Sequence, residues 1–366
     1  MNAITVVVLV FSLLGALDRI FGNRFGLGAE FERGFHFLGI MALSMIGMII
    51  IAPAFGAWLK PMFEGFYTVF GIDPSVLPAS IFANDMGGAS LAFEVCKDNA
   101  VGAYNALVVS SMLGCVLSFT VPFALGAVDA AQHKELFFGF LCGIVTIPVG
   151  CIVSGFLCGL TATQIFLNLL PLLVLSAVIA AGLLFVPNIS IKLFRWFGVL
   201  MKVLITVGLA CGVFTFLTGV TLVPEFDRFE AGANICVNAA VTMSGAFPMM
   251  FVVSKLLRKP MTAFGKKLGV NATSAVCFVS TIMTSVTTFG LMKDMDKKGV
   301  ALNAAFAVSA SFAVGSHLGF TMAYDPAYVT PMIVGKLVAG VAALALAVVL
   351  YDRTEKKAAA KESVHA

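Results

Sequence analysis

The sequence predicts an all-α, polytopic bundle of transmembrane helices with inverted structural repeats and two re-entrant hairpins in which the helix is broken. Three observations predict it: the apolar composition, the length of the apolar segments, and a repeat at a fixed offset. Of the 366 residues, 60% are hydrophobic and 11% are charged, and the mean hydropathy is +1.02. Soluble domains carry about 25% charged residues, so this chain suits a bilayer rather than water.

Nine apolar segments are long enough to cross a bilayer, since a helical span needs about 20 mostly apolar residues. They are 3–20, 35–59, 101–128, 136–159, 163–186, 197–223, 232–254, 300–323 and 329–351. No Lys or Arg precedes the first of them. A cleavable signal peptide has a positive leading region, so we expect this segment to remain as a span.

Two further apolar segments contain polar breaks. Residues 74–95 include Asn84-Asp85-Met86-Gly87-Gly88, and residues 270–292 include Thr284-Ser285-Val286-Thr287-Thr288. Irregular backbone at membrane depth is tolerated only where it is buried in protein or lines a cavity. We therefore expect both segments to be re-entrant hairpins rather than full spans.

The charges between the spans predict the orientation, because cytoplasmic loops concentrate Lys and Arg. Basic residues gather in the expected loops 187–196 and 255–269 and in the tail at 353–366, whereas the 224–231 loop is acidic. A hairpin at 270–292 places all three basic segments, and with them the C-terminus, in the cytoplasm. A full crossing there would place the tail outside.

An internal repeat divides the chain. Lys60-Pro61-Met62 recurs as Lys259-Pro260-Met261, and Ala103-Tyr104-Asn105 corresponds to Ala301-Leu302-Asn303, at an offset of about 198 residues. With the predicted orientation, residues 1–160 and 191–352 form two inverted halves joined by a linking span at 161–190. Secondary transporters of this build hold their solute near the bilayer midplane.

Asp85 is the sharpest functional feature. A carboxylate at membrane depth costs roughly 2.5–3.5 kcal/mol on insertion scales and needs a partner, which a cationic amine would supply. The alternative is a structural carboxyl, either protonated or bound by nearby amides. His317 lies well inside the 300–323 segment. It is either a solute-binding or proton-relay residue, or a neutral side chain hydrogen-bonded between helices.

The other candidate substrate-binding residues are polar or small and lie at the two breaks or at matching positions in the halves: Asn84, Met86, Gly87, Gly88, Asn105, Thr284, Ser285, Asn303 and Ser316. For Asn105 and Asn303, hydrogen bonding between helices is the alternative. We expect Lys202 and Lys336 to extend to the membrane interface, with a site role as the alternative for Lys336. Phe82, Phe93 or Phe289 could face an ammonium group.

Enzymatic chemistry is not expected. The four histidines and eight cysteines form neither an HExxH motif nor a CxxC pair. We predict no catalytic residues, no metal and no cofactor, and without a long basic run we predict no nucleic-acid partner.

Several stretches across nearly the whole chain closely resemble the EutH-type ethanolamine permeases. They are Leu17-Asp18-Arg19-Ile20, Phe31-Glu32-Arg33-Gly34-Phe35, Asp85-Met86-Gly87-Gly88, Gly143-Ile144-Val145-Thr146-Ile147-Pro148-Val149-Gly150-Cys151, Phe306-Ala307-Val308-Ser309-Ala310, His317-Leu318-Gly319-Phe320 and Pro331-Met332-Ile333-Val334-Gly335-Lys336-Leu337. The resemblance implies a multi-pass protein of the bacterial cytoplasmic (inner) membrane that imports ethanolamine for ethanolamine utilisation. Transporters of this build are often homodimers, and we expect one here.

The chain departs from the family pattern at three places. At the second break, members often have a paired asparagine and a proline, where this chain has Thr284-Ser285 and Thr287. Ser316 stands where an aspartate is common, and Arg33 where a second glutamate is common. Asp85 remains, so we predict import of a small cationic amino alcohol, ethanolamine, by alternating access. The alternative is an ion-coupled transporter of another small polar solute, such as a carboxylate.

Overall fold

The computed structural model describes residues 3–365, and their side chains except those of residues 64, 66 and 354–365. All the secondary structure in these residues is helical. The long helices are α1 (Ala3–Ile20), α2 (Leu27–Phe70), α7 (His133–Leu157), α8 (Ala162–Phe185), α9 (Pro187–Thr218), α10 (Phe229–Leu268) and α15 (Val329–His365). The side chains of the predicted basic tail, apart from Arg353, lie outside the described residues.

Shorter helical pieces lie between them. They are α3 (Val76–Ile81), η1 (Asn84–Met86), α4 (Gly88–Val95), α5 (Asn99–Tyr104), η2 (Asn105–Gly114), η3 (Val116–Thr120), α6 (Val121–Ala127), η4 (Ala130–Gln132), α11 (Ala272–Met283), α12 (Ser285–Gly290), η5 (Met292–Asp294), α13 (Lys297–Ala310), α14 (Ser316–Tyr324) and η6 (Pro326–Tyr328). The pieces from α5 to α6 follow one another closely, and residues 99–127 together form one long apolar stretch.

Eight of the described helical stretches are long and apolar enough to cross a membrane. The remaining predicted span, 300–323, is not one helix, because α13 ends at Ala310 and α14 begins at Ser316. Between them Phe312 has a φ of 61°, which is rare for a bulky side chain. Contacts that are distant in sequence stabilise this break, because the amide groups of Phe312 and Val314 donate to the carbonyls of Thr281 (3.3 Å) and Ile282 (2.9 Å).

Two segments predicted as loops are helical. Residues 187–196 form the first turns of α9, and residues 255–268 belong to α10. Pro187 fits the first position of a helix because the amide hydrogen that it lacks would have no partner there. Pro260 removes a single hydrogen bond from a 40-residue helix, and the Lys and Arg residues around it are good helix formers.

Both predicted helix breaks are present. In the first, α3 and α4 are separated by extended residues, by η1 and by Gly87 in a left-handed conformation. In the second, α11 and α12 are separated by Thr284, which is extended. Whether the two segments re-enter the membrane on their own side stays a prediction.

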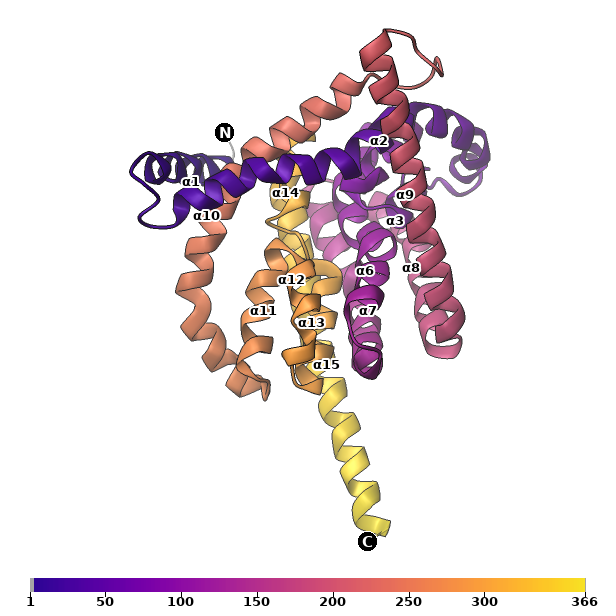
Figure 1. Ribbon diagram of the computed structural model, residues 1–366. Helices are drawn as coiled ribbons and strands as arrows, with labels where there is room; N and C mark the ends of the chain where they lie inside the picture. Colours follow the sequence, from indigo (N-terminus) through magenta and orange to yellow (C-terminus); the bar gives the residue numbers. More distant parts are fainter. Residues whose placement is uncertain (1–2, 366) are drawn as a thin grey trace.

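The arrangement of the helices agrees with the charge pattern (Figure 1). Helices α7, α9, α13 and α15 run in similar directions, and α1 and the first part of α2 run crosswise to them. The carboxyl ends of α10 and α15 and the junction of α8 with α9 lie toward the lower end, and the α9–α10 loop lies at the upper end. The basic segments and the acidic loop therefore occupy opposite ends, as predicted. Which end faces the cytoplasm stays a prediction.

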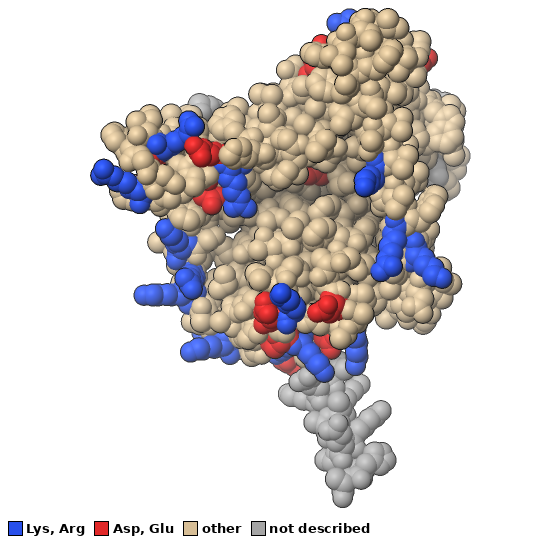
Figure 2. Space-filling view, viewed as in Figure 1, with Lys and Arg blue, Asp and Glu red and all other residues tan. Residues whose placement is uncertain are grey.

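The surface fits a membrane protein. On the face drawn in Figure 2, a wide area is uncharged, and many of the charged side chains gather toward the lower edge and the left. Large apolar side chains such as Leu170, Val174 and Val178 of α8 are about half exposed or more. Lipid is the solvent that suits such a helix.

The bases of the two broken segments carry matching hydrogen bonds. The Asn105 amide donates to the Ser75 hydroxyl (2.9 Å) at the start of α3, and the Asn303 amide donates to the Ser274 carbonyl (3.0 Å) in the first turn of α11. Asp73 accepts from the Ser75 amide (2.9 Å), as Asn271 does from the Ser274 amide (2.9 Å). These pairs follow the sequence repeat. The inversion of the two halves and their boundaries stay predictions.

Candidate functional site

Asp85 lies where the first helix is broken. It is the middle residue of the single turn η1, and its side chain is 17% exposed. Gly87, which follows this turn, has a φ of 96°, and a Cβ atom there would lie 2.5 Å from Cε of Met48. Only glycine meets both conditions without strain, so Gly87 is the residue that permits the turn.

The wide helix η2 holds the break in place. A Cβ atom on Gly114 would lie 2.0 Å from the carbonyl oxygen of Phe82, so α3 and η2 are in direct backbone contact. The Ala83 amide donates to the Ser118 hydroxyl at 2.9 Å. Residues 105–114 and 116–120 are π-helical, a conformation that is rare and frequent at functional sites.

The structure brings His317 to Asp85, although the two are far apart in sequence. His317 Nε2 lies 3.7 Å from Asp85 Oδ1, within ion-pair range but beyond a hydrogen bond. The Ser316 hydroxyl also interacts with this carboxyl. Ser316 and His317 belong to the first turn of α14, where the helix dipole favours a negative charge. The unpredicted break before α14 thus forms part of the site.

Lys336 is buried, which corrects its expected place at the membrane interface. Only 1% of the residue is exposed. Its ammonium donates a hydrogen bond to the Ser111 carbonyl of η2, and its charge acts on Asp85. The sequence signal was a single cation in the apolar part of α15, residues 329–351, about two turns from its start at Val329.

Close packing of α15 on α7 prevents Lys336 from reaching the interface. A Cβ atom on Gly335 would lie 1.8 Å from the Ser154 hydroxyl, and one on Gly150 would lie 2.3 Å from the Gly335 carbonyl. The Ser154 hydroxyl also donates to the Pro331 carbonyl at 2.8 Å. Small residues therefore fix α15 with the lysine facing η2 and Asp85.

Aromatic rings border the site on one side. Phe312 contacts His317, with ring centroids 5.3 Å apart, and Phe119 contacts Phe312 at the same distance. Met86 packs with these two phenylalanines against Ala83 and Cys115. Sequence reasoning missed Phe312 because the residue was expected inside a regular helix.

The three aromatic residues proposed from the sequence contact other rings, although Phe82 directly precedes the first break and packs with Met86. Phe82 stacks on Phe197 (5.8 Å), Phe93 stacks on Tyr324 (5.5 Å), and Phe289 is buried against Phe123 and Phe140.

Residues next to the second break hold the segment that precedes His317. Its residues Thr281 and Ile282 accept the hydrogen bonds of the 311–315 segment described above. The Thr284 hydroxyl accepts from the Val286 amide (3.2 Å), so it caps α12. Ser285 is fully buried, and its hydroxyl has no hydrogen-bond partner in the described part of the chain.

Asn105 and Asn303 lie at the bases of the broken segments rather than at the breaks. Both are fully buried, and their amide nitrogens are used at the bases of α3 and α11. Asn105 also donates to Asn168 of the linking helix α8 at 3.1 Å. Their contacts match the alternative that they hold helices together.

Unpaired polar atoms mark the neighbourhood of Asp85. Asn84 Nδ2 and His317 Nδ1 are buried and have no hydrogen-bond partner among the described residues. An unpaired buried polar group costs about 1–3 kcal/mol. A small solute with both a donor and an acceptor would satisfy these groups as well as the carboxylate.

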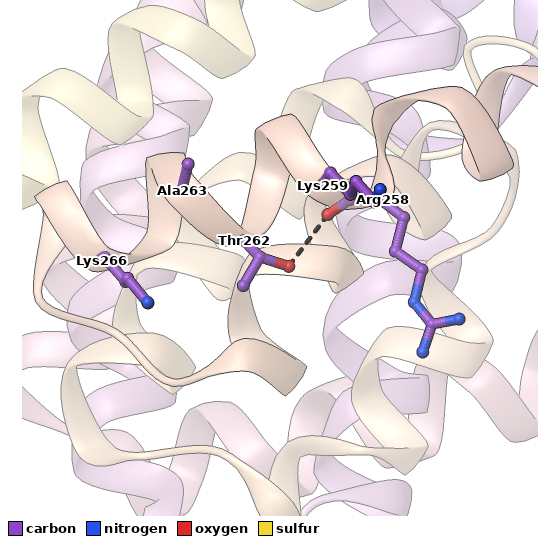
Figure 3. A pocket seen from close by; sticks show the side chains of 5 residues that line it. All are labelled: Arg258, Lys259, Thr262, Ala263 and Lys266. Atoms are coloured by element: carbon purple, nitrogen blue, oxygen red, sulfur yellow. Dashed lines mark hydrogen bonds between the residues drawn. The ribbon is translucent and has the colours of Figure 1, made fainter.

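Two cavities lie away from this site. One, of about 370 Å³, is lined by Ser90, Phe93, Glu94, Asp227, Tyr324 and Asp325 among others. The other, of about 490 Å³, is a basic hollow on α10 lined by Arg258, Lys259, Thr262, Ala263 and Lys266 (Figure 3). Phe93, named above as a possible contact of an ammonium group, lines the first cavity, and the candidate substrate-binding residues line neither.

Comparison with known proteins gives one consistent result. The family model described as "Ethanolamine utilisation protein, EutH" matches residues 1–350. A protein of Listeria monocytogenes named "Probable ethanolamine permease EutH" is 41% identical over 97% of this chain and 95% of its own length. A protein of the same name from Salmonella typhimurium is 35% identical over 95% of each chain. A Bacillus subtilis protein named "Uncharacterized protein YxeR" is 38% identical over 94% of each. No solved structure matches.

Proposed function

Because the chain belongs to the EutH family of ethanolamine utilisation proteins, we propose that it imports ethanolamine across the bacterial cytoplasmic membrane by alternating access. Family membership and the eight long apolar helices make it a multi-pass membrane transporter rather than an enzyme. The observation that carries the choice of solute is the part-exposed carboxylate of Asp85 at a helix break inside an apolar bundle.

The chemistry of the site fits a protonated amino alcohol. Ethanolamine is mostly an ammonium ion at neutral pH, and a carboxylate in a low-dielectric surrounding binds such an ion strongly. Its hydroxyl can both donate and accept, and the unpaired nitrogens of Asn84 and His317 offer partners for it. Met86 and Phe312 would cover the two methylene groups.

The other predicted binding residues take supporting roles in this proposal. Gly87 and Gly88 give the chain its turn, and Ser316 positions the carboxyl of Asp85. Thr284, Ser285, Asn105 and Asn303 hold the broken helices in register. The homodimer and the cytoplasmic C-terminus belong to the same proposal.

Alternating access would require the broken helices to move. Two short helices joined by an extended or left-handed residue can rotate about that residue, whereas a continuous helix resists bending. The breaks at Gly87, Phe312 and Thr284 lie close to the proposed site, where a small rotation changes access from one side to the other.

Asp85→Asn tests the proposal. We expect the variant to lose uptake of labelled ethanolamine into proteoliposomes, because the amide keeps the shape but cannot pair with an ammonium ion. The matched control is Asp129→Asn, since Asp129 is exposed outside the site, and this variant should transport normally. If Asp85→Asn reached the membrane and transported at the normal rate, Asp85 would not bind the solute.

The carboxylate alternative rests on a specific observation, the buried ammonium group of Lys336, whose charge acts on His317. Competition separates the two solutes. Excess unlabelled amino alcohols should block uptake of labelled ethanolamine, and dicarboxylates should not. Uptake of a labelled dicarboxylate that depends on Lys336 would reverse the assignment.

A further inference from the structure

We propose that Lys336 is a proton-carrying counter-ion of Asp85, so that each ethanolammonium ion taken up is exchanged for one proton and transport moves no net charge. This inference rests on the proposed function and adds its coupling. It also gives a role to a buried ammonium group that the binding of the amine leaves unexplained.

The first step is the charge of the empty site. Asp85 contributes one negative charge and Lys336 one positive charge. His317 is counted in its neutral form, since it carries a charge only when protonated. Other titratable groups that act on Lys336 come from the neighbouring elements: Cys115, which follows η2, and Cys151 of α7. Tyr104 of α5 is hydrogen-bonded to the Cys151 carbonyl (2.8 Å). In their usual protonation states these three are uncharged, so the empty site is neutral.

The second step is the charge of the occupied site. An ethanolammonium ion paired with Asp85 adds one positive charge beside Lys336. Two positive charges would then lie near one carboxylate in a buried surrounding, where an unbalanced charge is strongly disfavoured. Release of one proton restores neutrality, and burial together with a nearby cation favours the neutral form of a lysine.

The geometry allows the neutral form. Lys336 contacts the Ser111 carbonyl in η2, and either an ammonium or a neutral amine can donate to that carbonyl. No carboxylate within 4.0 Å holds Lys336 as an ion pair among the described side chains, so release of a proton breaks no salt bridge. The proton leaves Lys336 Nζ for water on the side from which the solute enters.

The cycle then balances. On the other side the solute leaves Asp85, and Lys336 takes up one proton from that solution before the empty site returns. One ethanolammonium ion moves inward and one proton moves outward. Uptake should therefore respond to a pH gradient, with an acidic interior favouring accumulation, and should not respond to membrane voltage.

The test compares voltage responses in proteoliposomes that contain the full chain. At zero pH gradient, an inside-negative potential should leave ethanolamine uptake by the unaltered protein unchanged. In Lys336→Met no lysine balances Asp85, so at alkaline pH, where an unpaired carboxyl is ionised, the occupied site is neutral, the empty site is negative and uptake should become electrogenic. A potential of about 100 mV should then accumulate the solute about 50-fold, the ratio expected for one charge crossing it. Lys202→Met, at an exposed lysine of α9, is the matched control and should stay insensitive to voltage.

Lys336→Arg keeps the positive charge but cannot release a proton at any accessible pH. We expect it to fold, to lose most uptake, and not to regain uptake at alkaline pH. This variant keeps the proposal testable if Lys336→Met does not reach the membrane. Vesicles without protein correct for diffusion of the free amine, which carries no current.

Each outcome decides one of the two proposals. Ethanolamine uptake by the unaltered protein that rises with inside-negative voltage would overturn the exchange and leave the proposed function intact. Electroneutral transport by Lys336→Arg at the normal rate would also overturn it. Absence of specific ethanolamine uptake by the unaltered protein would instead reject the proposed function, and the exchange with it.

Discussion

The position of the Asp85 side chain depends on a glycine two residues further along the chain. The carboxylate lies in a single helical turn that ends at Gly87, where the chain takes a left-handed conformation. A side chain at Gly87 would be strained by its φ of 96° and would meet Met48. The position of the charge is therefore set by backbone geometry as much as by side-chain contacts.

Gly87→Ala should destabilise the protein by about 1–3 kcal/mol, because a non-glycine residue would be held in a disfavoured conformation. The same variant should lose most ethanolamine uptake, since η1 would shift. Gly126→Ala is the matched control, because a Cβ atom there meets no other atom within 4 Å and the backbone is ordinary. Melting temperatures in detergent measure the first effect. Equal melting temperatures for the two variants would show that the left-handed turn is not needed.

The pair α7 and α15 shows how elements position the second charge. Their contact depends on Gly150, Gly335 and the hydroxyl of Ser154, and Thr146 also donates to the Ala339 carbonyl (3.2 Å). Small residues let helices approach closely in lipid, where dispersion and hydrogen bonds replace the hydrophobic effect. Lys336 follows Gly335 directly, so any change in this contact moves the ammonium group.

Gly335→Ala should separate α15 from α7, and we expect a lower melting temperature and slower uptake. The added methyl group would lie 1.8 Å from the Ser154 hydroxyl and 2.8 Å from the Gly150 carbonyl. Adding Ser154→Ala removes the first of these clashes, so the double variant should recover part of the stability. Additive losses in the double variant would show that the two residues do not clash.

At the scale of the whole molecule, the basic and acidic segments lie at opposite ends of the bundle. The basic end includes the hollow on α10 around Lys259 and Lys266 (Figure 3). Cytoplasmic segments are richer in Lys and Arg, so this end should face the cytoplasm and the acidic 224–231 loop should face outward.

Labelling with a membrane-impermeant maleimide in intact cells tests this orientation. Arg228→Cys should react from outside, and Lys259→Cys should react only after the cells are opened, since both positions are exposed. The unaltered protein is the background control, because its eight free cysteines are buried or partly buried. Reaction of both variants from the same side would contradict the predicted orientation.

The sequence by itself determined the features that depend on composition and local pattern. Low charge and long apolar segments predicted a helical membrane protein, and the resemblance to EutH permeases was confirmed. The polar residues within 74–95 and 270–292 predicted helix breaks, since glycine, asparagine and hydroxyl side chains favour interrupted helix. Asp85 was recognised because a carboxylate in an apolar segment requires a partner.

Only the tertiary structure decided which distant residues surround Asp85. The break before His317 depends on hydrogen bonds from 312 and 314 to 281 and 282, which no local pattern contains. From the sequence of its own helix, Lys336 was expected at the membrane interface. Its burial follows from the close packing of α15 on α7 and η2. Local propensity specifies where a helix is apolar or interrupted, whereas the neighbours of a buried charge are fixed by packing between segments far apart in sequence.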